Sequence, residues 1–509
     1  MEGFLLNCNK EFMDKYILAI DAGTTSSRAI IFNKNAEVIE IAQYEFNQFF
    51  PKEGWVEHDA VEIWNTQLKA IKDVVNKSKI DPNQIDSIGI TNQRETTIIW
   101  DKISGKAIHN AIVWQDRRTT KFCNTLKEAG YEEMIRGKTG LLLDPYFSAT
   151  KIKWLIDKYS DSLSDLTKGK YLFGTVDTYL IWKLTRGKVH ATDATNASRT
   201  MLYDIENDNW SREICKLMNI PMLMLPKVLN SSDNYGLICQ SFFGAEIPIS
   251  GVAGDQHAAT IGQACFDPGM VKSTYGTGCF AMLNTGKSRL RSNNRLLSTI
   301  AYKLDGEITY ALEGSIFVAG AVVQWLRDGI KVINEAKDSD ALALDSDPNQ
   351  RLFFVPAFTG LGAPYWDAEA RGAIFGLTRN SGRGDITRAA LESVAYQTRD
   401  LIEAMKADWP ELKKTVLRVD GGLSASNWTM QFIADILPSS VDRPRVLETT
   451  ALGVAWLSGM YIDFYPSKAE FKKYWSREVR FEPNLAEKAR NSLYKGWKDA
   501  VRRTLSPGH

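Results

Sequence analysis

The chain has 509 residues, of which 44% are hydrophobic and 24% charged, and this composition is typical of a soluble globular protein with two or about three domains. Its 62 basic and 61 acidic side chains leave a net charge of +1, which does not favour binding to nucleic acid or to a membrane surface. No stretch approaches the roughly 18 consecutive apolar residues of a membrane helix, and the acidic N-terminus is not typical of a secretory signal. Six scattered cysteines without C-x-x-C spacing predict reduced thiols in a cytoplasmic protein.

The first part of the chain alternates strand-like and helix-like segments, which predicts an α/β fold. A helix is expected over 59–78, because apolar residues recur at helical spacing from Trp64 to Val75 and Asp59 stands at the N-cap position. Strands are expected over 16–21, 28–32, 37–46 and 85–91.

The second half of the chain restates the first. Residues 269–284, GMVKSTYGTGCFAMLN, again predict a strand, a turn of small residues and a second strand. A repeat at half the chain length indicates two related domains, divided into 1–262 and 263–509, rather than a solenoid with a short period. A helical pattern is expected over 313–326, interrupted by glycines, and an amphipathic terminal helix over 485–504.

The segment AIDAGTTSSR, residues 19–28, is the first candidate site. Successive backbone N–H groups in a tight turn form an anion nest, to which hydroxyl groups add donors. Arg28 can neutralise a phosphate, and Asp21 at the strand end can hold Mg²⁺ through water. An ordinary turn is the alternative interpretation.

Other phosphate-binding motifs do not occur in the sequence. It contains no G-x-x-x-x-G-K-[ST], no G-x-G-x-x-G and no His-Arg-Asp or Asp-Phe-Gly of protein kinases. A nucleotide would therefore be held by two hairpins facing each other across a cleft.

Glycines at two further turns suit close contact with a flat ligand such as adenosine. Gly421 and Gly422 follow a strand that ends at Asp420, with a helix expected to begin near Ser424, and Gly320 interrupts the pattern over 313–326. Tight connections and close helix packing are the alternatives.

Candidate substrate residues follow other strands. Arg94 and Glu95 are an adjacent donor and acceptor suited to the hydroxyls of a polyol, and a surface ion pair is the alternative. Trp114 can wall a small substrate, or belong to the core. Asp255 stands where a helix begins, as a general base or as an N-cap, whereas His257 is expected to be structural.

Eight motifs in this order carry a resemblance: AIDAGTTSSR, TNQRET, VWQDRR, GDQHAA, STYGTG, GLGAPYWD, RGAIFGLTR and DGG. From about Tyr16 to about Gly459 the chain closely resembles the FGGY carbohydrate kinase family, in its glycerol-phosphorylating branch. The resemblance implies two actin-like (ribonuclease-H-like) ATPase domains with a catalytic cleft between them. It also implies transfer of the γ-phosphate of ATP, with Mg²⁺, to a terminal hydroxyl of glycerol by a homodimer.

Matched positions imply the roles of individual residues. Asp255 is similar to the general base of the family, and Asp21 to its metal-associated aspartate. The implied glycerol site comprises Arg94, Glu95, Trp114, Tyr146, Asp255, Gln256 and Phe280. The implied nucleotide contacts are Thr24, Thr25, Ser26, Arg28, Thr277, Gly320, Gln324, Gly422 and Ser426.

The chain also departs from the family pattern. Ser426 stands where many relatives have asparagine, and Ala22 replaces a frequent glutamine. Residues 235–249 lack the Gly-Gly-Thr-Arg loop through which some bacterial relatives bind fructose 1,6-bisphosphate, so inhibition by that ligand is not expected. They also contain no histidine, so the activation by phosphohistidine found in other bacterial relatives is not expected either. A family member acting on xylulose or gluconate, or an actin- or Hsp70-like ATPase switch, remains an alternative; the polar and aromatic substrate residues favour the kinase.

Overall fold

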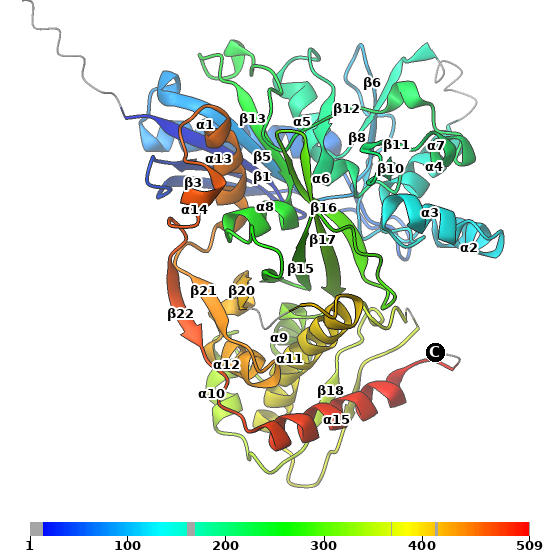
Figure 1. The fold of residues 1–509 in the computed structure, drawn as a ribbon, viewed down its shortest axis with the longest axis vertical. Helices are drawn as coiled ribbons and strands as arrows, with labels where there is room; N and C mark the ends of the chain where they lie inside the picture. Colours follow the sequence, from blue (N-terminus) through cyan, green and yellow to red (C-terminus); the bar gives the residue numbers. More distant parts are fainter. Residues whose placement is uncertain (1–13, 160–167, 368, 413–415, 508–509) are drawn as a thin grey trace, which may run out of the picture.

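The computed structural model describes residues 14–159, 168–367, 369–412 and 416–507, and two large mixed β-sheets organise it (Figure 1). The first sheet has five strands. In spatial order they are β13 (Ile249–Gly254), β5 (Ile85–Asn92), β1 (Tyr16–Ala22), β2 (Ser26–Phe32) and β3 (Val38–Glu45). The four strands predicted in this region are confirmed as β1, β2, β3 and β5.

The second sheet has seven strands and repeats the pattern of the first. In spatial order they are β16 (Leu297–Leu304), β17 (Glu307–Ile316), β15 (Cys279–Gly286), β14 (Val271–Tyr275), β20 (Leu417–Asp420), β21 (Val441–Pro444) and β22 (Arg477–Phe481). In each sheet three antiparallel strands are followed by two parallel ones: β3, β2, β1, β5, β13 in the first and β17, β15, β14, β20, β21 in the second. The predicted internal repeat and α/β fold class are therefore confirmed.

One face of the first sheet is covered by α1 (Ala60–Ser78). The side chain of Asp59 accepts a hydrogen bond from the backbone of Val61, as the predicted N-cap should. Leu18 and Ile20 of β1 pack with Ile71 in the core on this side of the sheet.

The opposite face of the first sheet is covered by a helix from the far end of the chain. This helix, α13 (Thr449–Tyr461), packs on β1, β5, β13 and on α8 (Asp255–Gly262), and its orange ribbon lies among the blue and green elements of Figure 1. A Cβ on Gly89 would lie 2.2 Å from the carbonyl oxygen of Val454, so only glycine allows this approach. The domain division at residue 262 stays a prediction. Helix α13, which lies beyond that residue, covers one face of the first sheet.

Helices also cover the second sheet. These are α11 (Arg383–Asp408) and α12 (Asn427–Ile436). The terminal α15 (Glu487–Thr504) packs on α12 and on the short strand β18 (Phe353–Val355), and it confirms the helix predicted at this end. The other helices in the described residues are α2 (Thr120–Glu128), α3 (Glu132–Thr139), α4 (Ser148–Lys158), α5 (Val176–Leu184), α6 (Ala194–Ala197), α7 (Arg212–Leu217), α9 (Gly320–Gln324), α10 (Asp338–Leu344) and α14 (Lys468–Phe471). The short strands are β4 (Glu57–His58), β6 (Ile98–Asp101), β7 (Ala111–Ile112), β8 (Tyr171–Gly174), β9 (Ala191–Asp193), β10 (Tyr203–Asp204), β11 (Asn209–Trp210), β12 (Lys227–Leu229), β18 (Phe353–Val355) and β19 (Ala373–Phe375).

One predicted helix is wrong over its first part, and another begins slightly later than expected. The segment 313–326 begins as a strand, since Gly314 pairs with Ala281 inside the sheet, and only α9 and a π-helical turn over Trp325–Gly329 are helical. The helix expected near Ser424 begins at Asn427, after a 3-10 turn over Gly422–Ala425. In both places hydrogen bonding to neighbouring strands or a cap overrides a short local pattern.

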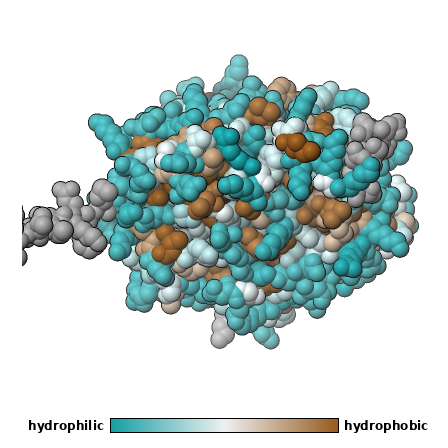
Figure 2. All heavy atoms as spheres, turned by 90° about the horizontal axis from the view of Figure 1, so that it is seen from above, coloured by the Kyte–Doolittle hydropathy of each residue, from teal (hydrophilic) through white to brown (hydrophobic). Residues whose placement is uncertain are grey.

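Within the part of the chain that the structure describes, no helix combines the length and apolarity needed to cross a bilayer. The five cysteines in that part are free thiols, and Cys8 lies outside the described residues. Figure 2 shows apolar side chains scattered among hydrophilic ones on one face of the molecule.

Candidate active site

The chain turns sharply after β5, at Arg94 and Glu95. The N–H of Thr96 donates to the carbonyl of Arg94 at 2.7 Å, and this bond closes a three-residue turn with Glu95 at its centre and a φ of 60°. Positive φ is uncommon for residues with a side chain, and such turns are strained. Arg94 and Glu95 are only 3% and 1% exposed, so the alternative of a surface ion pair is wrong.

Arg94 and Glu95 belong to a buried cluster of four charges. The Nη1 and Nη2 atoms of Arg94 donate to Glu313 at 2.5 and 3.2 Å, while Arg199 donates to Glu95 at 2.7 Å and to Glu313 at 3.0 Å. Burial acts to raise the pKa of Glu313, but Arg199 and Arg94 outweigh it, and the pKa lies below its ordinary value. Sequence reasoning missed Arg199 and Glu313; a charged residue within the apolar strand β17 was the available signal.

Asp255 is the first residue of α8, after the N-cap Gly254. Its carboxylate lies 3.2 Å from Nε of Arg94 and accepts the N–H of Gln256 at 2.6 Å, and 32% of its side chain is exposed. The predicted alternative of an N-cap is therefore wrong. Burial raises the pKa of Asp255 above its ordinary value, and Arg94 opposes this rise. A partly exposed carboxylate with a raised pKa suits a general base.

Three aromatic rings surround these charges. Trp114 lies edge-on to Tyr146 and to Phe280, with ring centroids 5.7 and 6.1 Å apart, and Arg94 lies over the ring of Phe280 at 5.9 Å. The indole N–H of Trp114 donates to Thr24 at 3.0 Å. The predicted polyol residues thus lie together, and they adjoin the first hairpin.

Two buried lysines support this group, and neither was predicted from the sequence. Lys151 donates to the carbonyls of Pro145, Tyr146 and Phe147 at 2.5 to 3.2 Å, and burial lowers its pKa to about 8. Lys272 on β14 donates to the side chain of Gln256 at 2.5 Å. His257 is buried beside Thr299, where burial lowers its pKa, in agreement with the expected structural role.

The first predicted phosphate turn joins β1 to β2; Thr25 is exposed there, and Thr24 and Ser26 are partly exposed. Arg28 at its base is ion-paired with Asp21 and, at 2.8 Å, with Glu448. The two residues predicted to bind phosphate and metal therefore neutralise each other here.

The second predicted turn joins β14 to β15 and carries the exposed Thr277. The carbonyl of Thr277 accepts the N–H groups of Ala319 and Ala321, so the start of α9 lies against this turn. A Cβ on Gly320 would lie 2.6 Å from the carbonyl oxygen of Gly276, which accounts for that glycine by close packing. Gln324, at the end of α9, is exposed.

Gly421 and Gly422 differ in what surrounds them. Gly421 has a φ of 85°, and its Cβ would lie 2.6 Å from the carbonyl of Tyr275, whereas a Cβ on Gly422 would meet open space. Protein packing therefore explains Gly421 but not Gly422. Ser426 caps α12 and donates to Asp340 at 2.5 Å, so its hydroxyl already has protein partners.

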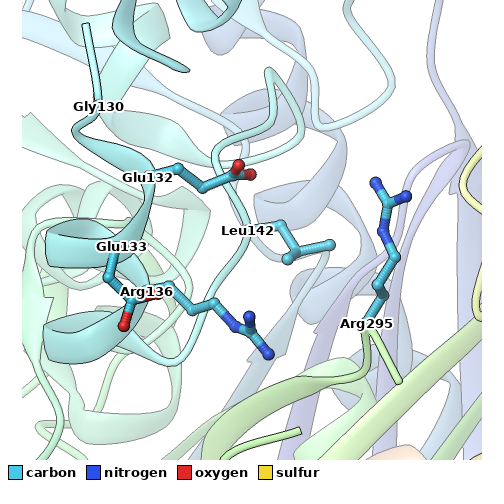
Figure 3. A pocket seen from close by; sticks show the side chains of 6 residues that line it. All are labelled: Gly130, Glu132, Glu133, Arg136, Leu142 and Arg295. Carbon is cyan, nitrogen blue, oxygen red and sulfur yellow. The ribbon is translucent and has the colours of Figure 1, made fainter. Parts of the chain in front are cut away.

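A separate pocket of about 500 Å³ lies between α3 and Arg295 (Figure 3). Glu132 and Arg136 extend toward it from α3, opposite Arg295. None of the predicted site residues lines it. This pocket is therefore distinct from the candidate site, which is the polar and aromatic cluster around Asp255.

Comparison with known proteins identifies the family of the chain. Residues 16–262 match the FGGY family of carbohydrate kinases, N-terminal domain, and residues 271–461 match the C-terminal domain of that family. Glycerol kinase of Rhizobium meliloti (strain 1021) is 59% identical over 97% of this chain and 99% of its own. Glycerol kinase of Sinorhizobium fredii is likewise 59% identical, with the same coverage.

Solved structures show the same architecture. The crystal structure of Plasmodium falciparum glycerol kinase with ADP matches with a TM-score of 0.91 and 36% identity, over 97% of this chain and 99% of that one. The ligand-bound xylulose kinase of Lactobacillus acidophilus matches with a TM-score of 0.86 at 22% identity over 96% and 98% of the two chains, and this likeness concerns the fold alone. The predicted two-domain, actin-like α/β fold is confirmed, and this chain belongs to the FGGY family of carbohydrate kinases.

Proposed function

We propose that this enzyme phosphorylates glycerol with ATP, giving sn-glycerol 3-phosphate and ADP. The observation that carries the proposal is the convergence of Arg94, Glu95 and Asp255 with the rings of Trp114 and Phe280. The relatives named glycerol kinase, at 59% identity over nearly the whole chain, support the same substrate.

Glycerol is small, so its recognition depends on pairing its hydroxyls rather than on apolar burial. A buried polar group left unpaired by a wrong ligand discriminates far more strongly than a missing methylene. Arg94 and Glu95 supply a donor and an acceptor, and the rings of Trp114, Tyr146 and Phe280 cover the carbon backbone, with the side chain of Gln256 close by.

Asp255 is proposed as the general base. Its exposed portion leaves an oxygen accessible to the terminal hydroxyl, and its raised pKa makes it a stronger base than an ordinary aspartate. It would take the hydroxyl proton as the new O–P bond forms and the bond to the β-phosphate oxygen breaks.

Mg-ATP is proposed to lie between the two hairpins, beside Thr24, Thr25, Ser26, Thr277, Gly320, Gln324, Gly422 and Ser426. Among the described residues no group of three or more His, Cys, Asp or Glu side chains is placed to hold a metal. Mg²⁺ commonly uses one or two carboxylates with substrate phosphates, and Asp21 fits that smaller role. Mg²⁺ when bound neutralises charge on the phosphates. Arg28 would exchange Asp21 and Glu448 for a phosphate.

Division into domains 1–262 and 263–509, with the cleft between them, is part of this proposal, as is a cytoplasmic homodimer that binds neither nucleic acid nor membranes. The family resemblance and the net charge of +1 support these points. Light scattering of the purified protein measures the oligomeric state directly.

The decisive experiment is ADP release with Mg-ATP and a panel of polyols and sugars, including xylulose and gluconate. Glycerol-dependent ADP release with formation of glycerol 3-phosphate supports the proposal, and better turnover of another panel member overturns it. Stabilisation against heat by millimolar glycerol separates a kinase from an ATPase switch, which needs no polyol site.

A further inference from the structure

Arg199 and Glu313 have no role in the proposed chemistry, yet both are fully buried charges beside the polyol site. Both residues are 0% exposed. Burying an ion pair costs desolvation free energy that packed apolar side chains would not cost, so a fully buried pair beside a binding site suggests that its geometry is used.

The contacts of both side chains lead back to the polyol site. Glu313 engages Arg94 through both carboxylate oxygens and shares Oε1 with Arg199. Arg199 then donates from Nε to Glu95 and lies over the ring of Tyr146 at 5.7 Å. The two neighbours Arg94 and Glu95 are thus connected through a chain of two distant residues.

This chain of contacts spans the two sheets. Arg94 and Glu95 follow β5 of the first sheet, Arg199 follows α6, and Glu313 lies on β17 of the second sheet. A strained turn persists only when surrounding structure over-determines it, and the turn at Glu95 receives such support from Arg199. The orientation of the Arg94 guanidinium therefore depends on a carboxylate from the other sheet.

We propose that Glu313 and Arg199 are positioning residues for the polyol. They hold the Arg94 fork and the Glu95 carboxylate in the geometry that binds two hydroxyls, and they act through those residues rather than on the nucleotide. The inference rests on the proposed function, since it assigns the polyol to Arg94 and Glu95.

The test is the Glu313→Gln variant, which keeps the shape and removes the charge. We expect the glycerol KM to rise about 10- to 100-fold while the ATP KM stays within about twofold. Arg199→Lys, which keeps the charge and loses the fork, should raise the glycerol KM in the same direction, and it provides a second reading if Glu313→Gln does not fold.

A double-mutant cycle with Arg94→Ala separates positioning from general stability. If Glu313 acts through Arg94, Glu313→Gln should change the glycerol KM little in the Arg94→Ala background. Glu392→Gln is the matched control, because Glu392 is also buried and lies 3.4 Å from an arginine, Arg388, on α11. We expect the control to leave the glycerol KM unchanged.

An unchanged glycerol KM in Glu313→Gln, or an equal rise in the Arg94→Ala background, overturns the inference. The inference is also overturned if the loss of activity in these variants parallels the fall in melting temperature, because a merely structural role predicts that result. If the parent protein prefers another polyol, the proposed function fails, and the same cycle on that polyol still tests Glu313.

Discussion

Asp255 lies 3.2 Å from Arg94 with part of its carboxylate exposed, and its pKa is raised. Replacement with asparagine keeps the shape and the bond from the Gln256 N–H but removes the proton acceptor. We expect Asp255→Asn to lower kcat about 10²- to 10⁴-fold, with a smaller change in glycerol KM. Steady-state kinetics measure both, and near-normal turnover would remove Asp255 from the role of base.

Glu392 offers a test of pH-dependent stability, since burial raises its pKa from 4.5 to about 7. In this window the folded protein holds a proton that the unfolded chain releases, so its contribution to the free energy of unfolding falls as pH rises. Glu392→Gln lacks this loss. Relative to the parent, the variant should gain up to about 3 kcal/mol between pH 4.5 and 7.5, measured by urea unfolding. A constant difference across that range contradicts the prediction.

At the residue scale, sequence motifs predicted the site residues that follow strand ends. They did not predict the buried residues that pair with those side chains. Arg94, Glu95 and Asp255 were predicted from adjacent donors, acceptors and helix starts. Glu313 is separated from Arg94 by 219 positions, so no local spacing could join them. The pairing of Arg28 with Asp21 is local, but its competition with a phosphate is visible only in three dimensions.

At the element scale, α8 and α13 touch at their backbones. A Cβ on Gly453 would lie 1.9 Å from the carbonyl oxygen of Ala258, so one of the two helices must shift, and α8 carries Asp255 as its first residue. We expect Gly453→Ala to lower the free energy of unfolding by about 1–3 kcal/mol or more and to lower kcat as well.

The matched control is Gly137→Ala in α3, where a Cβ would meet no atom within 4 Å. Alanine favours a helix by about 1 kcal/mol over glycine, so this variant should be as stable as the parent or more so. Thermal unfolding of the two variants decides the matter, and equal losses would exclude helix contact as the cause.

Helices and strands were predicted well where the periodic pattern extends over many residues. The helix predicted over 59–78 rests on apolar residues that recur at helical spacing from Trp64 to Val75, and α1 (Ala60–Ser78) follows it almost residue for residue. The segment 313–326 is short and apolar, so its sequence is compatible with a helix and with a buried strand. Pairing with β15 makes its first part a strand. Strand pairing is a property of the sheet and cannot be read from one segment.

At the scale of the whole molecule, the ion pair of Arg28 with Glu448 joins a hairpin of the first sheet to the residue before α13. The Glu448 side chain makes no capping bond, so Glu448→Gln should leave the helix intact. We expect a lower ATP KM, by up to about fivefold, because a part-exposed pair is worth about 0–1 kcal/mol and competes with the phosphates.

The glycerol KM should stay within about twofold in that variant, and added salt should shrink the ATP effect as it screens the pair. Titration of ATP at low and high ionic strength provides the measurement. An ATP KM unchanged at low salt would show that Arg28 is not held back by Glu448.

The repeat of strand and hairpin predicted two related halves, and the two sheets bear this out. The return of α13 to the first sheet was not predicted, since its apolar sequence is compatible with burial against either sheet. Helix α13 has consequences for how the chain is made. During synthesis on the ribosome, one apolar face of the first sheet stays uncovered until Thr449–Tyr461 has been synthesised and has left the ribosome. Such an exposed face is a substrate for chaperones, and premature termination before Thr449 would leave a fragment prone to aggregate.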